Sequence, residues 1–296
     1  MFQNLKSQEF RVVLHQGDII VVGPIHRRNR AKTSCSKRRF VPFLILLLLL
    51  MPGVPLRGQE TPGAADSIRV AVFRVDENRE LPTHVVEDLQ RDSLIQPKAI
   101  TAAEIQQGKL ADFQVVLFPG GSGSAQGRKL DKLGREQVRE FVSKGGGYVG
   151  ICAGAYLASA DYDWSLHLLD AKVLDRRHWA RGFGTVQLRV SAETGKHLGL
   201  KETEINCYYH QGPLLSPANR DDLPDFESWA AFGSEVKKKG VPEGVMVGTT
   251  AIAACHFGRG RVLAISPHPE KTDALDHVLA HAIHWVAADD KEIRQP

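Results

Sequence analysis

One cysteine lies among small residues in residues 145–159, GGGYVGICAGAYLAS, directly after an apolar run and directly before a helix-like run. Gly150 and Gly154 stand two residues to either side of Cys152, the spacing of a tight strand–turn–helix elbow. Such a turn holds its central residue in a strained backbone conformation, and larger neighbours would collide with the adjoining strand and helix. The N–H groups that begin the following helix favour a thiolate. The pattern predicts that Cys152 is a nucleophile, with a buried packing cysteine as the alternative.

A second motif, SPHPE, supplies the groups that a cysteine nucleophile needs. His268 and Glu270 follow the apolar run RVLAIS, which predicts a strand. His268 can accept the thiol proton, and Glu270 can accept the N–H on the other side of the imidazole ring. An exposed loop is the ordinary explanation of such a pair. At a strand end of a parallel sheet, however, it can lie next to Cys152.

Two further segments belong to the same predicted pocket. In FPGG, Gly120 and Gly121 end a strand and leave backbone N–H groups free to face an oxyanion, and the N–H of Ala153 could be the second donor. In YYHQGP, Tyr209, His210 and Gln211 offer donors that could contact a substrate. The alternatives are an ordinary turn between a strand and a helix for FPGG, and a surface loop after a strand for YYHQGP.

The segments that must position these residues alternate between strand and helix in the first half of the chain. The second half is mostly strand-like, and FGRGR is expected to be a hairpin turn between two strands. This order predicts a parallel sheet with helices on both faces and an added β-rich section, in one domain. The expected strands are 68–75, 112–121, 146–154, 184–192, 205–213, 228–236, 250–258 and 261–270, and the expected helices are 81–92, 102–109, 130–143 and 276–286.

The motifs FPGG, GICAG and HPE, in this order, resemble those of the class I glutamine amidotransferase superfamily. The sequence of residues 145–159, with YYHQGP later, resembles most closely the biotin-protein ligase N-terminal domain family. The resemblance covers roughly residues 68–288. It implies a flavodoxin-like, doubly wound, mostly parallel α/β fold with a Cys-His-Glu triad.

Carried over by motif, the resemblance implies that Cys152 is the nucleophile, His268 the base and Glu270 the orienting acid. It implies oxyanion donors at Gly121 and Ala153. The sequence shows neither a synthetase domain that would consume ammonia nor a ligase domain, so the resemblance by itself implies neither amide transfer nor biotin chemistry.

Three functions remain open from the sequence. The first is a hydrolase that cleaves a small-molecule amide or related carbonyl compound through a thioester at Cys152, and the triad favours it. The second is a non-catalytic module that binds a small ligand in the same pocket. The third is a glutaminase-type subunit that supplies ammonia to a separate partner. None of them requires a cofactor, and the oligomeric state stays open.

No metal site is expected either. His277, His281 and His284 recur at helical spacing, which a metal site could use, but apolar residues occupy the opposite face of the same helix. The pattern therefore predicts that these histidines form the solvent-facing side of an amphipathic helix.

Charge is unevenly distributed along the 296-residue chain, whose net charge is +4. Residues 1–58 hold ten of the 38 Lys/Arg but only two of the 34 Asp/Glu, which leaves 28 and 32 in the remainder. The folded part is slightly acidic, which argues against a nucleic-acid partner.

The basic part of residues 1–58 precedes the apolar run FVPFLILLLLLMPGV at residues 40–54. A basic segment before a short apolar run is typical of a secretory signal, and the run is shorter than the roughly 20 residues that span a bilayer. We expect a leader at 1–58, a linker at 59–67 and the amidotransferase-like domain at 68–290. The domain would be exported to the periplasm or the extracellular space, and a membrane-tethered form would exist if the signal stays uncleaved.

Three cysteines follow the leader. If the domain is exported, Cys207 and Cys255 could form a disulfide, which would leave Cys152 as the free thiol.

Overall fold

The computed structural model describes residues 12–15, 18–21 and 67–288. The chain divides into two units, Met1–Gln59 and Glu60–Pro296. In the first unit, β1 (Val12–His15) and β2 (Asp18–Val21) form an antiparallel pair. The predicted signal at 40–54 lies outside the described residues. Within the described part of the chain, no helix combines the length and the apolar character that crossing a membrane requires.

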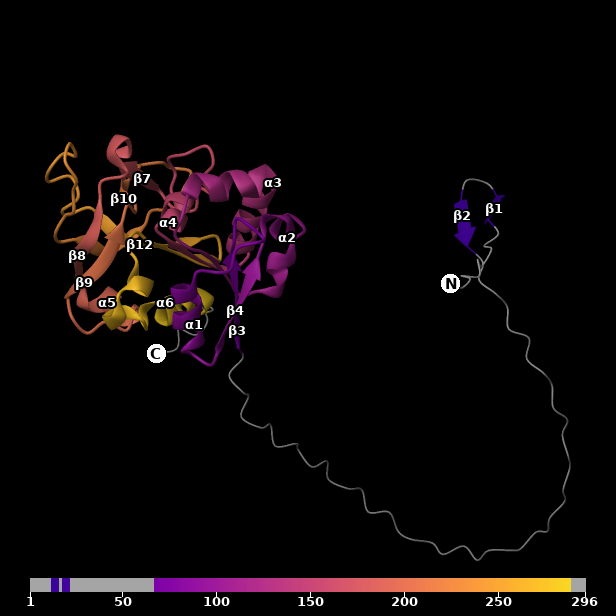
Figure 1. The fold of residues 1–296 in the computed structure, drawn as a ribbon, viewed down its shortest axis with the longest axis horizontal. Coiled ribbons are helices and arrows are strands. Elements are labelled where there is room, and N and C mark those ends of the chain that lie inside the picture. The colour runs from indigo at the N-terminus through magenta and orange to yellow at the C-terminus, as the bar shows by residue number, and fades with distance from the viewer. Residues whose placement is uncertain (1–11, 16–17, 22–66, 289–296) are drawn as a thin grey trace, which may run out of the picture. The chain divides into compact units, whose positions relative to one another are not determined.

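The second unit is built on an 11-stranded mixed sheet (Figure 1). Its first half is parallel, with the strands in the order β4-β3-β5-β6-β13. These strands are β3 (Ile68–Phe73), β4 (Ile95–Ile100), β5 (Val115–Phe118), β6 (Gly147–Ile151) and β13 (Gly260–Ile265).

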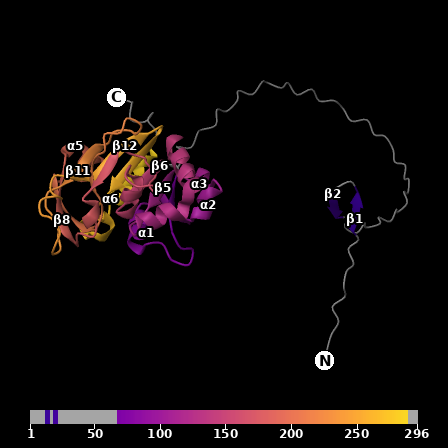
Figure 2. The same cartoon turned by 90° about the horizontal axis from the view of Figure 1, so that it is seen from above.

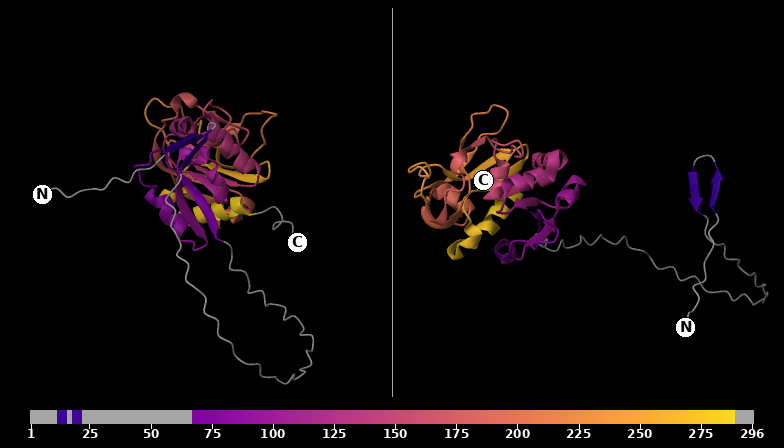
Figure 3. Two further views of the ribbon diagram at one scale, coloured as in Figure 1. Left: turned by 90° about the vertical axis from the view of Figure 1, so that its right-hand side faces the viewer. Right: turned by 45° about the horizontal axis from the view of Figure 1, so that its top comes forward.

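Antiparallel strands extend the sheet beyond β13 in the order β12-β11-β8-β9, and β10 pairs with both β12 and β7. In the right-hand view of Figure 3, the salmon and orange antiparallel strands lie to the left of the purple and magenta elements of the parallel half. The predicted α/β class with a β-rich second half is therefore confirmed. The strands are β7 (Ala171–Leu174), β8 (Phe183–Val190), β9 (Glu204–His210), β10 (Leu214–Pro217), β11 (Glu227–Phe232) and β12 (Thr250–Phe257).

Helices cover both faces of the sheet (Figure 2). Side chains alternate along each buried strand, so Val115 and Leu117 of β5 pack with α1 and α6, whereas Val116 and Phe118 pack with α2, α3 and α4. The first face carries α1 (Thr83–Gln90), α5 (Ala192–His197) and α6 (Val278–Ala287), and the second carries α2 (Ala102–Gln106), α3 (Gly123–Ser143) and α4 (Ala153–Ala158). Single 3-10 turns form at η1 (Lys109–Asp112), η2 (Arg176–His178), η3 (Pro269–Lys271) and η4 (Asp273–Leu275).

Strands β7 and β10 and helix α5 were not predicted. Helix α3 and strand β4 also differ from the sequence prediction, for identifiable reasons. Helix α3 begins at Gly123 rather than at residue 130, because the Ser122 side chain accepts a hydrogen bond from the Ala125 N–H and caps the helix there. The expected apolar spacing starts only near Asp131, where the helix has non-helical dihedral angles. Strand β4 was not predicted, because it contains Pro97. As an edge strand, β4 tolerates a proline.

The hairpin predicted at FGRGR is confirmed. Strands β12 and β13 are antiparallel neighbours with Phe257 opposite Gly260, and Gly258 has a φ of 62°. The hairpin places β13 next to β6, which brings the SPHPE motif to the edge of the sheet where Cys152 lies.

Candidate active site

Three motifs meet at the carboxyl edge of the parallel half of the sheet. Strands β5, β6 and β13 are parallel neighbours. Gly120 follows β5, Cys152 follows β6 and His268 follows β13. The crevice at the carboxyl ends of the strands is where open α/β sheets bind ligands.

The elbow at Cys152 has the strained geometry that its glycines predict. Cys152 has φ 50° and ψ −94°, and α4 begins at the next residue. A Cβ on Gly154 would lie 2.2 Å from the Phe118 carbonyl oxygen, and one on Gly150 would lie 2.5 Å from the Gly154 carbonyl. Small residues are thus required at both positions. The Cys152 thiol is buried and donates a hydrogen bond to the His210 carbonyl oxygen at 3.4 Å.

The His268 ring is held by Glu270. Nδ1 of His268 lies 2.7 Å from Oε1 of Glu270, and the two residues are only 3% and 6% exposed. The loop is fixed in turn, because the His268 backbone N–H donates to the Tyr208 carbonyl oxygen at 2.7 Å. Since Glu270 occupies Nδ1, Nε2 is the ring nitrogen left for Cys152.

The environment raises the pKa of His268 from 6.5 to about 9. Burial is the largest single contribution, and it lowers the pKa. Hydrogen bonds to Cys152 and Glu270, together with their charges, outweigh burial and favour the imidazolium form. At neutral pH this ring is therefore protonated and is a proton donor held beside Cys152.

The predicted oxyanion donors flank the same thiol. Ala153 is the first residue of α4, so its N–H has no carbonyl partner within the helix. Gly121 has a φ of 139°, which only glycine adopts readily. A Cβ on Gly120 would lie 2.8 Å from Cε1 of His268 and 3.8 Å from Cβ of Cys152. Gly120 is thus small because the imidazole ring packs directly against it.

A cavity of about 780 Å³ opens onto these residues. This volume falls within the ~300–1,000 Å³ typical of small-molecule sites. Cys152, His268 and Glu270 line it, together with His210 and Gln211 from the predicted substrate-binding segment. Aromatic and cationic side chains also line the cavity: Tyr156, Tyr162, Trp164, Arg176, Arg177 and Trp179.

Comparisons with known proteins agree with this architecture. The family model described as "Biotin-protein ligase, N terminal" matches residues 99–184, a segment that contains Gly120 and Cys152 but ends before His268. A structure of PurLQS from Thermotoga maritima has 15% sequence identity, a TM-score of 0.54, and covers 74% of this chain and 99% of that chain. A crystal structure of a glutamine amidotransferase has 20% identity, a TM-score of 0.51, and covers 74% and 98%. The chain therefore has the α/β fold of these glutamine amidotransferase structures, and residues 99–184 are similar to the biotin-protein ligase N-terminal family.

Sequence relatives of this amidotransferase-like chain match it over shorter stretches. The biotin–protein ligase of Schizosaccharomyces pombe is 30% identical over 67 residues, which cover 23% of this chain and 11% of the ligase. An uncharacterized protein of Chlamydia muridarum is 37% identical over 51 residues, 17% of this chain and 20% of that protein. The chain thus spans a fifth or less of these two relatives. The PurQ subunit of phosphoribosylformylglycinamidine synthase from Methanococcus maripaludis is 22% identical over 202 residues and covers 67% of that subunit.

The amidotransferase-like domain places one predicted substrate contact elsewhere. Tyr209 is fully buried, its ring packs against Phe232, and its hydroxyl donates to the Gly212 carbonyl oxygen at 2.7 Å. It does not line the cavity. Because side chains alternate along β9, Tyr209 shares the core-facing side with Cys207, while His210 faces the site.

The proposed disulfide between Cys207 and Cys255 is not formed. Cys207 packs in the core on the α1 and α6 face of the sheet, and Cys255 packs on the opposite face. Burial raises the pKa of each of these two thiols to about 12. Neither thiol is therefore reactive in the folded domain.

The three histidines near the C-terminus follow the solvent-facing side of α6. Nε2 of His284 lies 2.7 Å from Oδ2 of Asp92, so a carboxylate already engages this ring. The rings of His277 and His281 meet edge to face at 5.9 Å. Within the described residues, no group of His, Cys, Asp and Glu side chains has a geometry that could hold a metal ion.

Sequence reasoning missed the aromatic and cationic wall of the cavity. Tyr162 and Trp164 come from the loop after α4, and Arg176, Arg177 and Trp179 come from η2 and the residue after it. The two short runs YDW and RRHW place bulky aromatic and basic residues close together in loops, which is the one local signal that could have marked them.

Proposed function

We propose that this domain is a cysteine-dependent amidohydrolase that cleaves a small-molecule amide through a thioester at Cys152. The observation that carries the proposal is the buried His268–Glu270 pair, joined at 2.7 Å, beside a strained cysteine elbow that opens into a cavity. A site that only bound a ligand would gain nothing from a backbone held at φ 50° on a cysteine.

In the first half of the reaction, the Cys152 thiolate attacks the carbonyl carbon of the amide. A C–S bond forms, and the carbonyl π electrons move onto oxygen, where the N–H groups of Gly121 and Ala153 would stabilise the negative charge. The imidazolium of His268 then gives its Nε2 proton to the amide nitrogen. The C–N bond breaks, the amine leaves, and a thioester remains on Cys152.

In the second half, the neutral His268 ring removes a proton from a water molecule that attacks the thioester carbon. The tetrahedral intermediate expels the thiolate as the C–S bond breaks, and the carboxylic acid leaves. The proton stays on His268, so the initial thiolate–imidazolium pair is restored. Glu270 keeps the ring oriented and stabilises its positive charge in both halves.

The proposal is tested by incubating the domain with glutamine, γ-glutamyl amides and peptide amides, and by measuring ammonia or amine release. Glutamine belongs in the set because a structural relative is described as a glutamine amidotransferase. Release should disappear in Cys152→Ala and fall steeply in His268→Ala. Mass spectrometry of acid-quenched samples should show an acyl group on Cys152. A folded domain that binds such amides but releases no amine and never carries an acyl group would instead be a binding module.

We also propose that the domain acts outside the cytoplasm. The support is the basic segment and the apolar run at 40–54, which stand before the domain in the sequence. Expression of the full chain with a C-terminal tag, followed by cell fractionation and N-terminal sequencing, tests this proposal. A processed form that begins after residue 54 in the exported fraction supports it, and an unprocessed chain in the cytosol contradicts it.

A further inference from the structure

The cavity at Cys152 is lined by positive charge. Arg176, Arg177 and Lys271 all border it. Among the described residues that line this cavity, Glu270 is the only carboxylate, and His268 already neutralises it. Positive charge in a concave site attracts anions and raises their local concentration.

In the described part of the chain, no carboxylate pairs with Arg176 or Arg177. The neighbouring carboxylate, Asp175, is engaged by His178 and by Arg181, each at 2.6 Å. Neither Arg176 nor Arg177 forms an ion pair within the part of the chain that the structure describes. Their charges are therefore available to a ligand in the cavity.

Aromatic rings stand directly beside these charges. The rings of Tyr162 and Trp164 stack with centroids 4.4 Å apart and planes 16° apart, and the Arg176 guanidinium lies 4.3 Å above the Tyr162 ring. This contact holds Arg176 in place by a cation–π interaction. Trp179 also lines the cavity and is 56% exposed, so a flat face is open to a ligand at the cavity mouth.

The start of α3 adds to the same field. Ser122, Gly123 and Ser124 line the cavity, and the first turn of this helix contains no acidic residue. The partial positive charge of the helix N-terminus therefore stays uncompensated on this side. This partial charge adds to the full charges of Arg176 and Arg177 in the same cavity.

Resting on the proposed amidohydrolase function, we propose that the substrate is an amide that bears an anionic group, a carboxylate or a phosphate, next to a flat aromatic or heteroaromatic ring. The anionic group contacts Arg176 and Arg177, and the ring packs against the exposed face of Trp179. The amide carbonyl then reaches Cys152 at the bottom of the cavity. A plain aliphatic amide would leave this wall unused.

The test uses alkylating probes of matched shape, so it needs no knowledge of the substrate. Cys152 is alkylated with iodoacetanilide, with 4-(iodoacetamido)benzoate and with 4-(iodoacetamido)phenyl phosphate, and each second-order rate constant is divided by that for 2-mercaptoethanol. In every case the thiolate displaces iodide from the CH2 group. We expect this normalised rate constant to be at least about fivefold higher for the anionic probes than for iodoacetanilide at low salt, and the difference to become smaller in high salt.

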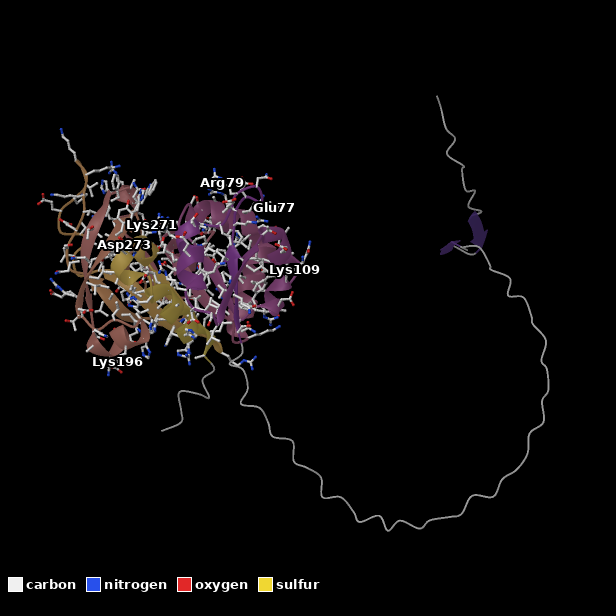
Figure 4. All side chains as sticks on the ribbon, turned by 60° about the horizontal axis from the view of Figure 1, so that its bottom comes forward. Glu77, Arg79, Lys109, Lys196, Lys271 and Asp273 are labelled. Atoms are coloured by element: carbon white, nitrogen blue, oxygen red, sulfur yellow. The ribbon has the colours of Figure 1, made fainter. Side chains whose placement is uncertain are left out.

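Substitutions test whether the preference for anionic aryl probes comes from Arg176, Arg177 and Trp179. Arg176→Gln and Arg177→Gln should each lower the anionic-to-neutral ratio by about two- to fivefold. Trp179→Ala should lower the rate of the aryl probes relative to iodoacetamide. Lys196→Gln is the matched control, because Figure 4 shows Lys196 well apart from Lys271, and its ratio should stay at the wild-type value.

The two proposals fail in different ways. If iodoacetamide reacts fast with Cys152 but the anionic-to-neutral ratio equals that of 2-mercaptoethanol, the substrate inference is overturned and the hydrolase proposal stands. If iodoacetamide itself reacts no faster than with 2-mercaptoethanol, the hydrolase proposal fails. A larger gain for the phosphate probe than for the carboxylate probe supports the inference and identifies the anionic group as a phosphate.

Discussion

Replacing Gly120 by alanine should lower the reactivity of the site by displacing the His268 ring, while the backbone N–H of residue 120 is kept. The new Cβ would lie 2.8 Å from Cε1 of His268. Non-bonded carbon atoms are comfortable at roughly 3.5–4.0 Å. Because His268 is buried and tied to Glu270, the ring cannot simply turn into solvent, and the clash must displace it from Cys152.

The required displacement sets the magnitude. Relief of the clash needs a shift of about 1 Å, and a misplacement of that size at a reacting group costs on the order of 100-fold in rate. The alkylation rate of Cys152 at pH 7 and the rate of amide hydrolysis should both fall by roughly 10- to 100-fold. Overpacking should also lower the free energy of unfolding by about 1–3 kcal/mol.

The assay is a double-mutant cycle. Iodoacetamide alkylation is followed at pH 7 for the wild type, Gly120→Ala, His268→Ala and the double variant, with thermal unfolding to verify that each is folded. Since Gly120→Ala acts only through the ring, it should have almost no further effect once His268 is alanine. Ser124→Ala, another small residue that lines the cavity, is the control and should react like the wild type.

Two results would refute this reasoning. A folded Gly120→Ala variant with wild-type reactivity would mean that His268 does not pack against Gly120. Equal effects of Gly120→Ala in the presence and absence of the imidazole would mean that the substitution acts through the backbone rather than through His268.

Three further predictions concern charge and burial. Glu270→Gln removes the charge that stabilises the imidazolium, so the pKa of His268 should fall from about 9, and the high-pH step in the Cys152 alkylation profile should move toward neutral pH. Burial raises the pKa of Asp88 from 3.8 to about 6. The stability that the protonated carboxyl contributes is therefore fully present below pH 3.8 and is lost as the pH rises through 6. Asp88→Asn should add about 1–3 kcal/mol to the free energy of unfolding at pH 8 and much less at pH 4, measured by urea titration, and an equal change at both pH values would contradict this. Cys207 and Cys255, buried and unpaired, should react with a thiol reagent only after unfolding, and a two-proton mass change on reduction would show a disulfide instead.

That Cys152, His268 and Gly120 lie close together was predictable because the sequence signals for their positions are local. The glycines around Cys152 indicate a tight backbone turn that leaves no space for larger side chains. The position of His268 after an apolar run indicates the end of a strand. Parallel order then brings such ends together without any knowledge of loop structure. Gly120 is also a glycine that close packing requires, and the group packed against it is the imidazole ring of His268.

The substrate-binding wall was not predictable, because it depends on how two loops fold over the cavity. Tyr162 and Arg176 are in contact although 14 positions apart in the sequence, and no periodicity marks either of them. Tyr209 shows the opposite failure: strand alternation would have placed it in the core with Cys207, but the polar neighbours of the segment suggested a pocket. The strand at Ile95–Ile100 was missed because a proline is disfavoured in strands except at an edge.

The central proposal is that His268 and Glu270 make Cys152 a reactive nucleophile, and the pH dependence of its alkylation tests this most directly. The rate constant with iodoacetamide is measured from pH 5 to pH 10, as a mass shift on the Cys152 peptide, for the wild type and for His268→Ala. The account predicts that the wild-type rate is already level near pH 7 and changes again only as His268 loses its proton near pH 9. In His268→Ala the rate should rise about tenfold per pH unit through the neutral range, as for an ordinary thiol. Identical profiles for the two proteins would contradict the account.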